Sequence, residues 1–358
     1  MKKSFLLLIA AALLAACSSN EMAVELKEKP IGFSRVYIDK STKAIRKGPY
    51  TTDNFEYVGN TFGVFGYKTT ETQMNAQVFN NVKVEYKNGL SSPPYEGTTD
   101  WAYSPLVYWD KTASNYKFFA YAPHSGDFTN TGVTFDINNA NSFKINDFEQ
   151  ALTVNDQIDL MTDLTNQNNV TGANIGDNDV KFTFGHILSN INVTMAVSSA
   201  LKADETDNPV SVVEVTLGTI KMKGSYAYDS GASAYKWTLS TSSPTTQLFS
   251  ATQSSGNVFA SKALTATPAA VPGLTGMLMI PQAVNANYEI YVKYKINTEV
   301  FERTIKLSDF KKSGTSLGTW DPGYKYTYNI VIGPTPILFD IIGVSDWGDG
   351  GVYTYTIE

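Results

Sequence analysis

Short runs in which apolar and polar residues alternate recur along this chain and restrict it to a fold built of β-strands. In the clearest run, residues 288–296, every second position is apolar: Tyr288, Ile290, Val292, Tyr294 and Ile296. A period of two places these side chains on one face of a strand and the residues between them on the other. One buried and one solvated face is typical of antiparallel sheets that pack as a sandwich. The sequence therefore predicts an all-β protein.

The length and composition of the chain extend this prediction to two domains. Its 358 residues exceed one ordinary domain, and its 21 Tyr and 19 Phe suit strands rather than helices. The stretch 165–179 is the most polar and poorest in strand patterns, so we place the domain boundary there. This division gives one β-sandwich domain at 47–178 and a second at 179–358. Another polar stretch, 240–261, is predicted to be a long surface loop.

The N-terminus carries the features of an export signal. Lys2 and Lys3 precede an apolar run at 5–14, which is too short to span a membrane because a span needs about 20 residues. The run ends in L-A-A-C at 14–17, which resembles the lipobox of bacterial lipoproteins, and Cys17 is the only cysteine. A lone cysteine forms no disulfide framework. We therefore predict a lipoprotein signal peptide at 1–17 and acylation of Cys17, the alternative being an ordinary signal peptide with a cysteine nearby.

Residues for catalysis, metal binding or nucleic-acid binding are scarce. The chain has two histidines and lacks the nucleophile-elbow, H-E-x-x-H and P-loop motifs. We predict that His124 is a solvated loop residue and that His186, between two apolar runs, is a hydrogen-bonded structural residue. The net charge of −6 and the presence of only three arginines argue against nucleic acid. The sequence predicts no enzyme, cofactor or metal site, and a secreted hydrolase with two carboxylates is the least favoured alternative.

Several short motifs follow one another in a recognisable order. They are I-G-F-S at 31–34, F-G-V-F-G-Y at 62–67, Y-W at 108–109, Y-K-F-F-A-Y-A-P at 116–123, D-L-M at 159–161, V-K-F-T-F-G-H-I-L-S-N-I at 180–191, M-I-P-Q at 279–282, W-D-P-G-Y-K-Y-T-Y-N-I at 320–330 and V-S-D-W at 344–347. In this order they resemble the fimbrillin family of Bacteroidales, the pilins of type V pili. The resemblance implies two tandem transthyretin-like β-sandwich domains and a surface-exposed fimbria on the outer membrane that mediates adhesion. Its partners would be other pilin subunits, of the same or a related fimbrillin; the motifs do not distinguish shaft, anchor and tip subunits.

The same resemblance implies assembly by exchange of strands between subunits. A trypsin-like protease would remove a propeptide, residues 18–46, together with the first strand, which lies within 31–38. Arg46 stands in the sequence K-A-I-R-K-G-P at 43–49, and basic residues beside Gly and Pro are typical of an exposed, cleavable loop. We predict cleavage after Arg46, with Lys43 as the alternative site. The other interpretation is an ordinary surface loop.

The C-terminal residues are candidates for the strand that replaces the first one in a neighbouring subunit. From residue 337 on, the sequence predicts two strands around a turn at 348–351. The donor-strand candidates lie in the second of them: Val352, Tyr353, Tyr355 and Ile357. A terminal strand is tethered at one end only, so it is free to pair in trans. The alternative is a last strand that completes its own domain.

A different class of function is compatible with the same composition. A surface lipoprotein would bind glycans through flat aromatic platforms, and this chain has 5 Trp and 21 Tyr. The platform candidates are aromatic residues on predicted loops: Tyr95, Trp101, Tyr103 and Trp109. Most other aromatic residues fall inside alternating strands, which favours the core. The alternative to a pilin is therefore a surface glycan-binding lipoprotein.

Overall fold

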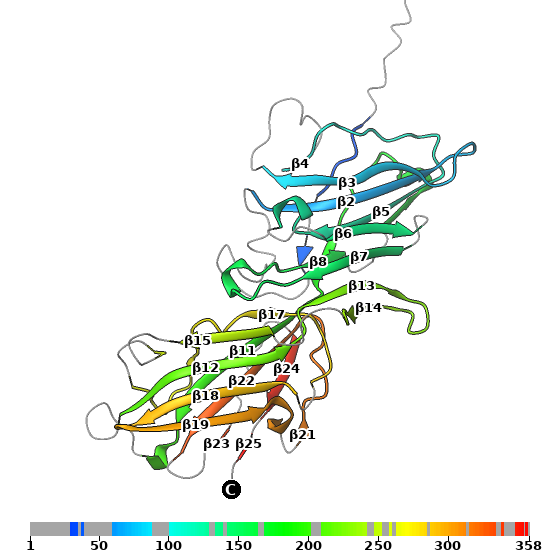
Figure 1. Ribbon diagram of the computed structural model, residues 1–358. Helices are drawn as coiled ribbons and strands as arrows, with labels where there is room; N and C mark the ends of the chain where they lie inside the picture. The colour runs from blue at the N-terminus through cyan, green and yellow to red at the C-terminus, as the bar shows by residue number, and fades with distance from the viewer. Residues whose placement is uncertain are drawn as a thin grey trace, which may run out of the picture.

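The computed structural model describes residues 29–34, 37–38, 59–87, 100–128, 133–138, 142–163, 168–201, 209–241, 247–252, 258–259, 263–284, 287–312, 315–333, 338–339, 348–353 and 355–356. Within these ranges the chain forms strands and short 3-10 helices, namely η1 (Ser125–Asp127), η2 (Val154–Asp156), η3 (Gly172–Asn174), η4 (Ser199–Leu201) and η5 (Leu307–Asp309). The molecule is elongated, with an N-terminal and a C-terminal lobe (Figure 1). The predicted all-β fold is confirmed. None of the helices in these ranges has the length and apolar character of a membrane span.

The N-terminal lobe is built around an eight-stranded sheet, called sheet 1. Its order is β1 (Tyr37–Ile38), β10 (Thr183–His186), β8 (Met161–Asp163), β5 (Asn115–Ala122), β2 (Thr61–Thr69), β3 (Ala76–Tyr86) and β4 (Trp101–Ala102), with β9 (Asn168–Thr171) also paired to β5. Both faces of its centre are covered, since β2 begins with six consecutive buried residues. Gly63 pairs with Tyr121, and a Cβ at Gly63 would clash with that ring. The glycines of the F-G-V-F-G-Y motif therefore make room for neighbouring aromatic side chains.

A second, four-stranded sheet packs on one face of sheet 1. Sheet 2 has the order β14 (Ala234–Leu239), β13 (Lys223–Asp229), β7 (Ser142–Glu149) and β6 (Thr134–Asn138). Phe143 of β7 lies between the sheets, with its ring centroid 6.3 Å from that of Phe65 and 5.8 Å from that of Tyr121. These residues belong to one buried cluster, which also takes in Tyr226 of β13. Sheet 2 thus joins a hairpin from the first half of the chain with one from the second.

The C-terminal lobe is a sandwich of two further sheets. Sheet 3 contains β16 (Ala269–Ala270), β17 (Met277–Met279), β11 (Ser189–Val197), β22 (Tyr324–Ile332), β24 (Gly348–Tyr353), β23 (Leu338–Phe339) and β25 (Tyr355–Thr356). Sheet 4 has the order β15 (Gln247–Thr252), β12 (Val210–Ile220), β18 (Glu289–Ile296) and β19 (Glu299–Lys306), and β20 (Lys311–Lys312) pairs with β21 (Thr315–Ser316). The alternation predicted at 288–296 is confirmed, because Ile290, Val292 and Tyr294 are buried in the core between these sheets.

Three details differ from the sequence predictions. The boundary predicted between residues 178 and 179 cuts through two sheets, because β10 lies in sheet 1 and the β13–β14 hairpin lies in sheet 2. The predicted loop at 240–261 contains β15, whose Phe249 is buried in the sandwich core. The predicted turn at 348–351 lies within β24, which runs parallel to β22. In the last two cases, pairing with a distant strand overrides the local turn preference of Ser, Thr and Gly.

Candidate assembly site

The first described residues, 29–34 and 37–38, are called the N-terminal segment, and they insert between two other parts of the N-terminal lobe. On one side, the amide of Ile31 donates to the carbonyl of Val107, at 2.8 Å. On the other side, the amide of Val180 donates to the carbonyl of Gly32, at 2.8 Å, and Ser34 donates to Val180, at 3.1 Å. Tyr37 and Ile38 then pair in parallel with β10. The segment is therefore an extended stretch held by backbone hydrogen bonds and isolated bridges on both sides, and it ends in the short strand β1.

Alternate side chains of the N-terminal segment fill the core. Ile31 and Phe33 are both fully buried. The Phe33 ring contacts four aromatic rings, with centroid distances of 5.5 to 5.8 Å: Phe62, Phe79, Tyr103 and Phe182. Full burial of one such side chain stabilises a fold by about 1.5–3 kcal/mol. Without the N-terminal segment, these four aromatic residues would line an open apolar groove.

Polar contacts fix the register of the segment in this groove. The Tyr103 hydroxyl donates to the carbonyl of Ile31, at 2.7 Å, and burial raises the pKa of this phenol well above its usual range, so it stays a donor. Gly32 faces the carboxylate of Asp179, which a Cβ at this position would hit. The same carboxylate lies 3.7 Å from the ammonium of Lys29, a half-exposed pair of little energetic weight. The groove therefore favours a segment with an apolar, a small and an apolar residue in succession, as at positions 31–33.

The predicted processing and anchoring residues lie outside the described residues. These are Cys17, Lys43 and Arg46. The described chain stops at Ile38 and resumes at Gly59, so both candidate cleavage sites fall between the N-terminal segment and β2.

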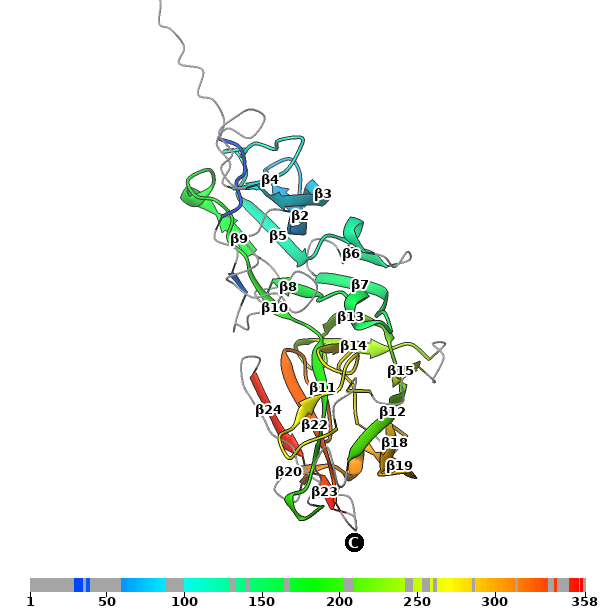
Figure 2. The same ribbon diagram turned by 90° about the vertical axis from the view of Figure 1, so that its left-hand side faces the viewer.

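The structure describes three of the four predicted donor-strand residues. Val352 and Tyr353 end β24, where they pair with Thr327 and Tyr328 of β22, and Tyr355 begins β25, where it pairs with Phe339. Ile357 lies outside the described residues. Within one chain the last strands thus add to sheet 3. β25 lies at the end of the molecule remote from the N-terminal segment (Figure 1), whereas β24 starts near the junction of the lobes and runs toward that end (Figures 1 and 2).

The two histidines have different environments. His124 caps η1: its Nδ1 accepts from the amide of Gly126, at 3.0 Å, and its Nε2 lies 3.2 Å from the carbonyl of Asn81. The prediction of a solvated loop residue is therefore wrong, because the side chain is half-buried against β3. His186 is buried, with Nδ1 2.8 Å from Oδ1 of Asp159, so the prediction of a hydrogen-bonded histidine is confirmed. No cluster of three metal-ligating side chains occurs among the described residues.

The aromatic residues considered as glycan platforms are part of the core. Trp101, Tyr103 and Trp109 are 1%, 3% and 1% exposed, so they offer no flat surface to a sugar. Tyr95 lies outside the described residues. Tyr103, Phe79 and Phe182 hold the N-terminal segment, and no local sequence pattern predicts this role. The local pattern marked them as aromatic, but only the fold brings them around Phe33.

These features define a class of protein: an all-β chain whose first described segment is held in the core between other segments. The chain belongs to the fimbrillin-like family, whose model matches residues 49–347. Fimbrium subunit Fim1C of Phocaeicola vulgatus is 29% identical over 197 residues, which cover 53% of this chain and 50% of that protein. The chain thus spans about half the length of the curated relative it matches. A crystal structure of a fimbrial protein from Bacteroides vulgatus has the same fold, with 20% identity, a TM-score of 0.55 and coverage of 86% of this chain and 96% of that one.

Proposed function

We propose that the protein is a structural pilin subunit of a surface fimbria, without catalytic activity, that supports adhesion. It polymerises when its N-terminal segment is exchanged for a strand of a neighbouring subunit. The observation that carries this proposal is the burial of Ile31 and Phe33 in an extended segment at the start of the described chain. Removing that segment opens an apolar groove with unpaired backbone groups, and a strand from another chain restores both kinds of contact.

Proteolysis supplies the trigger for this exchange. A trypsin-like protease that cuts after Arg46, or after Lys43, separates the N-terminal segment from β2 in the sequence. Before the cut, the segment is part of its own chain and outcompetes any strand from outside. After the cut, its dissociation is no longer reversed by the covalent link. The precursor therefore stays monomeric until it is processed.

The donor comes from the C-terminal end, and two stretches are candidates. The first is Val352 to Ile357, with apolar residues at alternate positions. The second is Ile342-Gly343-Val344-Ser345, which repeats the order of residue types in Ile31-Gly32-Phe33-Ser34. The close approach of Asp179 to Gly32 favours the second stretch, because it has a glycine at the matching position.

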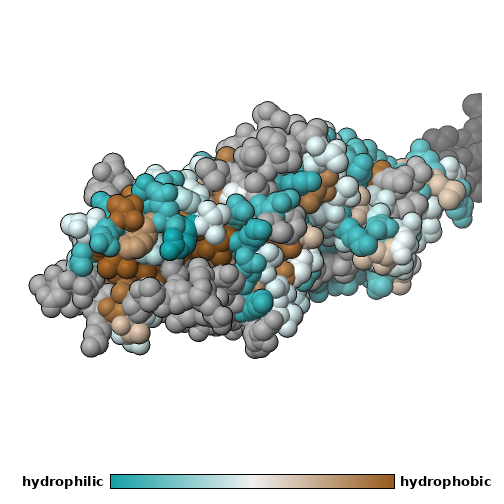
Figure 3. Space-filling model, turned by 60° about the horizontal axis from the view of Figure 1, so that its bottom comes forward, coloured by the Kyte–Doolittle hydropathy of each residue, from teal (hydrophilic) through white to brown (hydrophobic). Residues whose placement is uncertain are grey.

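The shape of the molecule suits end-to-end contacts. The groove lies in the N-terminal lobe, and β25, the last described strand, lies at the far end of the C-terminal lobe (Figure 1). Apolar residues reach the surface of the C-terminal lobe (Figure 3), and Val300 in this lobe is 50% exposed. A neighbour in a filament would cover such surface.

Polymerisation of the trypsin-treated precursor tests the proposal. We expect filaments by electron microscopy and a shift to large species in size-exclusion chromatography. If residues 352–357 are the donor strand, deletion of Val352–Glu358 is expected to abolish filaments. If residues 342–345 are the donor strand, Gly343→Val is expected to abolish them. Gly318→Val is the matched control, because a Cβ at Gly318 meets no neighbour within 4 Å.

Two results would contradict parts of this proposal. If the cleaved wild-type protein stays monomeric, strand exchange is wrong. If the deletion removes the cooperative thermal transition, the last strand belongs to its own lobe and is not the donor.

Anchoring to the outer membrane through Cys17 completes the proposed function. Acyl chains on this cysteine contribute roughly 0.8 kcal/mol per buried CH₂ to membrane binding. Cys17→Ala is expected to abolish labelling by a fatty-acid analogue in cells and to release the protein from the membrane fraction. Labelling that persists in the variant would rule out this anchor.

A further inference from the structure

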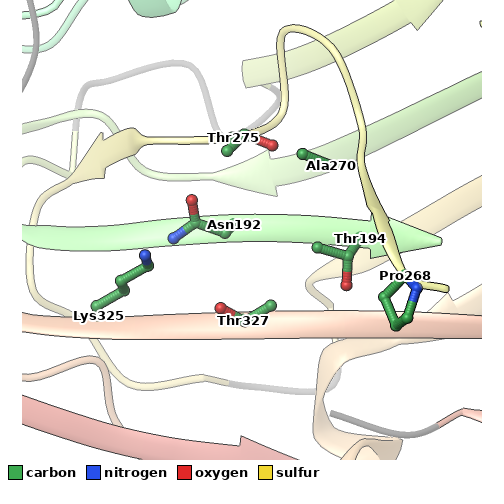
Figure 4. A pocket seen from close by; sticks show the side chains of 7 residues that line it. All are labelled: Asn192, Thr194, Pro268, Ala270, Thr275, Lys325 and Thr327. Atoms are coloured by element: carbon green, nitrogen blue, oxygen red, sulfur yellow. The ribbon is translucent and has the colours of Figure 1, made fainter. Parts of the chain in front are cut away.

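A hollow of about 340 Å³ lies on the outer face of sheet 3 in the C-terminal lobe. Figure 4 shows that its floor is made by β11 and β22 and that the chain from Pro268 to Thr275 forms one wall. The lining residues are Asn192, Thr194, Pro268, Ala270, Thr275, Lys325 and Thr327. This volume is at the lower end of small-molecule pockets, so the hollow suits a ligand of one or two sugar rings.

The polar floor follows from strand alternation. Ile191 and Val193 of β11 are buried in the core, so Asn192 and Thr194 face outward. Asn192 and Thr327 are direct neighbours in the parallel β11–β22 pair. The Asn192 amide is fixed on both sides, because its oxygen accepts from the amide of Gly276, at 2.8 Å, and its nitrogen donates to Oδ1 of Asn190, at 2.8 Å. Asn192 therefore ties the wall to the floor.

Two threonines of the hollow present acceptors rather than donors. The Thr194 hydroxyl donates its proton to Oδ1 of Asn329, at 2.9 Å, and the Thr275 hydroxyl donates to the carbonyl of Val271, at 3.1 Å. Their remaining lone pairs accept hydrogen bonds from a ligand. A ligand for this hollow therefore carries O–H or N–H donors.

Among the described residues that line the hollow, Lys325 alone is charged, and its ammonium points toward Asn192 (Figure 4). None of the ion pairs formed by the side chains that the structure describes involves Lys325. A charged donor of this kind favours an anionic acceptor. The described residues that line the hollow include no acidic side chain, so they offer no carboxylate to a cationic ligand.

We propose that this hollow binds a carboxylated sugar, such as a uronic acid unit of an extracellular glycan. The carboxylate accepts from Lys325 and the ring hydroxyls donate to Thr194 and Thr275. Pro268 and Ala270 contact the C–H surface of the ring. A neutral sugar leaves Lys325 without an acceptor, and a simple inorganic anion leaves both threonines without donors. The site would act whether or not the protein polymerises, so it goes beyond the role of a structural subunit.

Titration of the folded, full-length secreted chain tests the site, with galacturonate as the probe. Galactose is the neutral match, and acetate is a carboxylate without a ring. We expect galacturonate to bind at millimolar concentrations in calorimetry or by ¹H–¹⁵N chemical-shift changes, and more tightly than galactose or acetate. Lys325→Met is expected to weaken galacturonate binding roughly tenfold or more, the value of a charge-assisted hydrogen bond. Thr275→Val, at an exposed position, is expected to weaken it several-fold.

The control variant is Lys306→Met, which removes an exposed lysine of β19 in sheet 4, away from the hollow. Galacturonate binding to this variant is expected to match the wild type, and an unchanged melting temperature of Lys325→Met shows that its fold is intact. Equal binding of galacturonate and galactose, an unchanged affinity of Lys325→Met, or no binding of galacturonate would each overturn the proposal.

Discussion

Phe33 is the single residue on which the docking of the N-terminal segment depends most. Its ring is fully buried against four aromatic rings from residues 62 to 182. We predict that Phe33→Ala lowers the free energy of unfolding by about 3–5 kcal/mol, through lost burial and a cavity. Denaturant unfolding of the unprocessed protein measures this loss. Val300→Ala, at a half-exposed position, is the control and is expected to change stability by less than about 0.5 kcal/mol. A Phe33→Ala effect as small as that of the control would show that the segment is not docked.

His124 is expected to make the stability of the N-terminal lobe depend on pH. Burial lowers the pKa of this histidine below its usual 6.5, and its Nδ1 accepts a hydrogen bond that protonation would break. Below pH 6.5 the unfolded chain therefore binds a proton that the folded chain does not, so stability falls as pH falls. His124→Asn keeps an acceptor for Gly126 but does not titrate. We predict that the stability of the wild type falls more steeply than that of the variant between pH 7 and 5, which thermal unfolding at each pH measures. Parallel curves would exclude His124 as the cause.

At the scale of elements, the β13–β14 hairpin links the two halves of the chain. It pairs with β7 in sheet 2, while β12, directly before it, belongs to sheet 4. Trp237 of β14 donates from Nε1 to the carbonyl of Ile187, at 2.6 Å, and its ring packs 5.7 Å from that of Phe148. The hairpin is thus fixed by a hydrogen bond to the connection between β10 and β11.

Substitution of Trp237 tests this link. Trp237→Phe keeps an aromatic ring but leaves the Ile187 carbonyl without this donor, so we predict a loss of about 1–3 kcal/mol in the free energy of unfolding. Tyr228→Phe in the same hairpin, at a side chain that is 47% exposed, is the matched control and is expected to have little effect. Equal stability of both variants would mean that the hydrogen bond contributes nothing.

At the scale of the whole molecule, the two lobes are joined by more than one chain crossing. The chain passes from β10 to β11 between the lobes (Figure 2), and the β13–β14 hairpin returns to the N-terminal lobe. Polar contacts reinforce the junction, since the amide of Leu278 donates to Oε1 of Gln157, at 2.6 Å. The lobes are therefore joined by several chain crossings and by hydrogen bonds.

Truncation of the chain at Asn178 tests whether the first part folds by itself. Such a chain lacks β10 and the β13–β14 hairpin, which cover apolar residues of sheets 1 and 2. We predict that it shows neither a cooperative thermal transition nor dispersed amide resonances, whereas the full chain shows both. A truncated chain that unfolds cooperatively would instead support two independent domains divided at residues 178 and 179.

The sequence alone determined the all-β class, the buried face of runs such as 288–296, and the family through the order of its motifs. The sequence suffices for these features because alternation is a local property, and alternation determines which side chains of a strand become buried. The partners of each face were decided by tertiary structure. Phe33 meets Phe182 across almost 150 residues, and glycine-rich 348–351 extends as a strand because β22 offers its edge. The acceptor character of Thr194 likewise depends on Asn329, a neighbour in space only. Sheet pairing joins distant segments, and no local pattern specifies which ones meet.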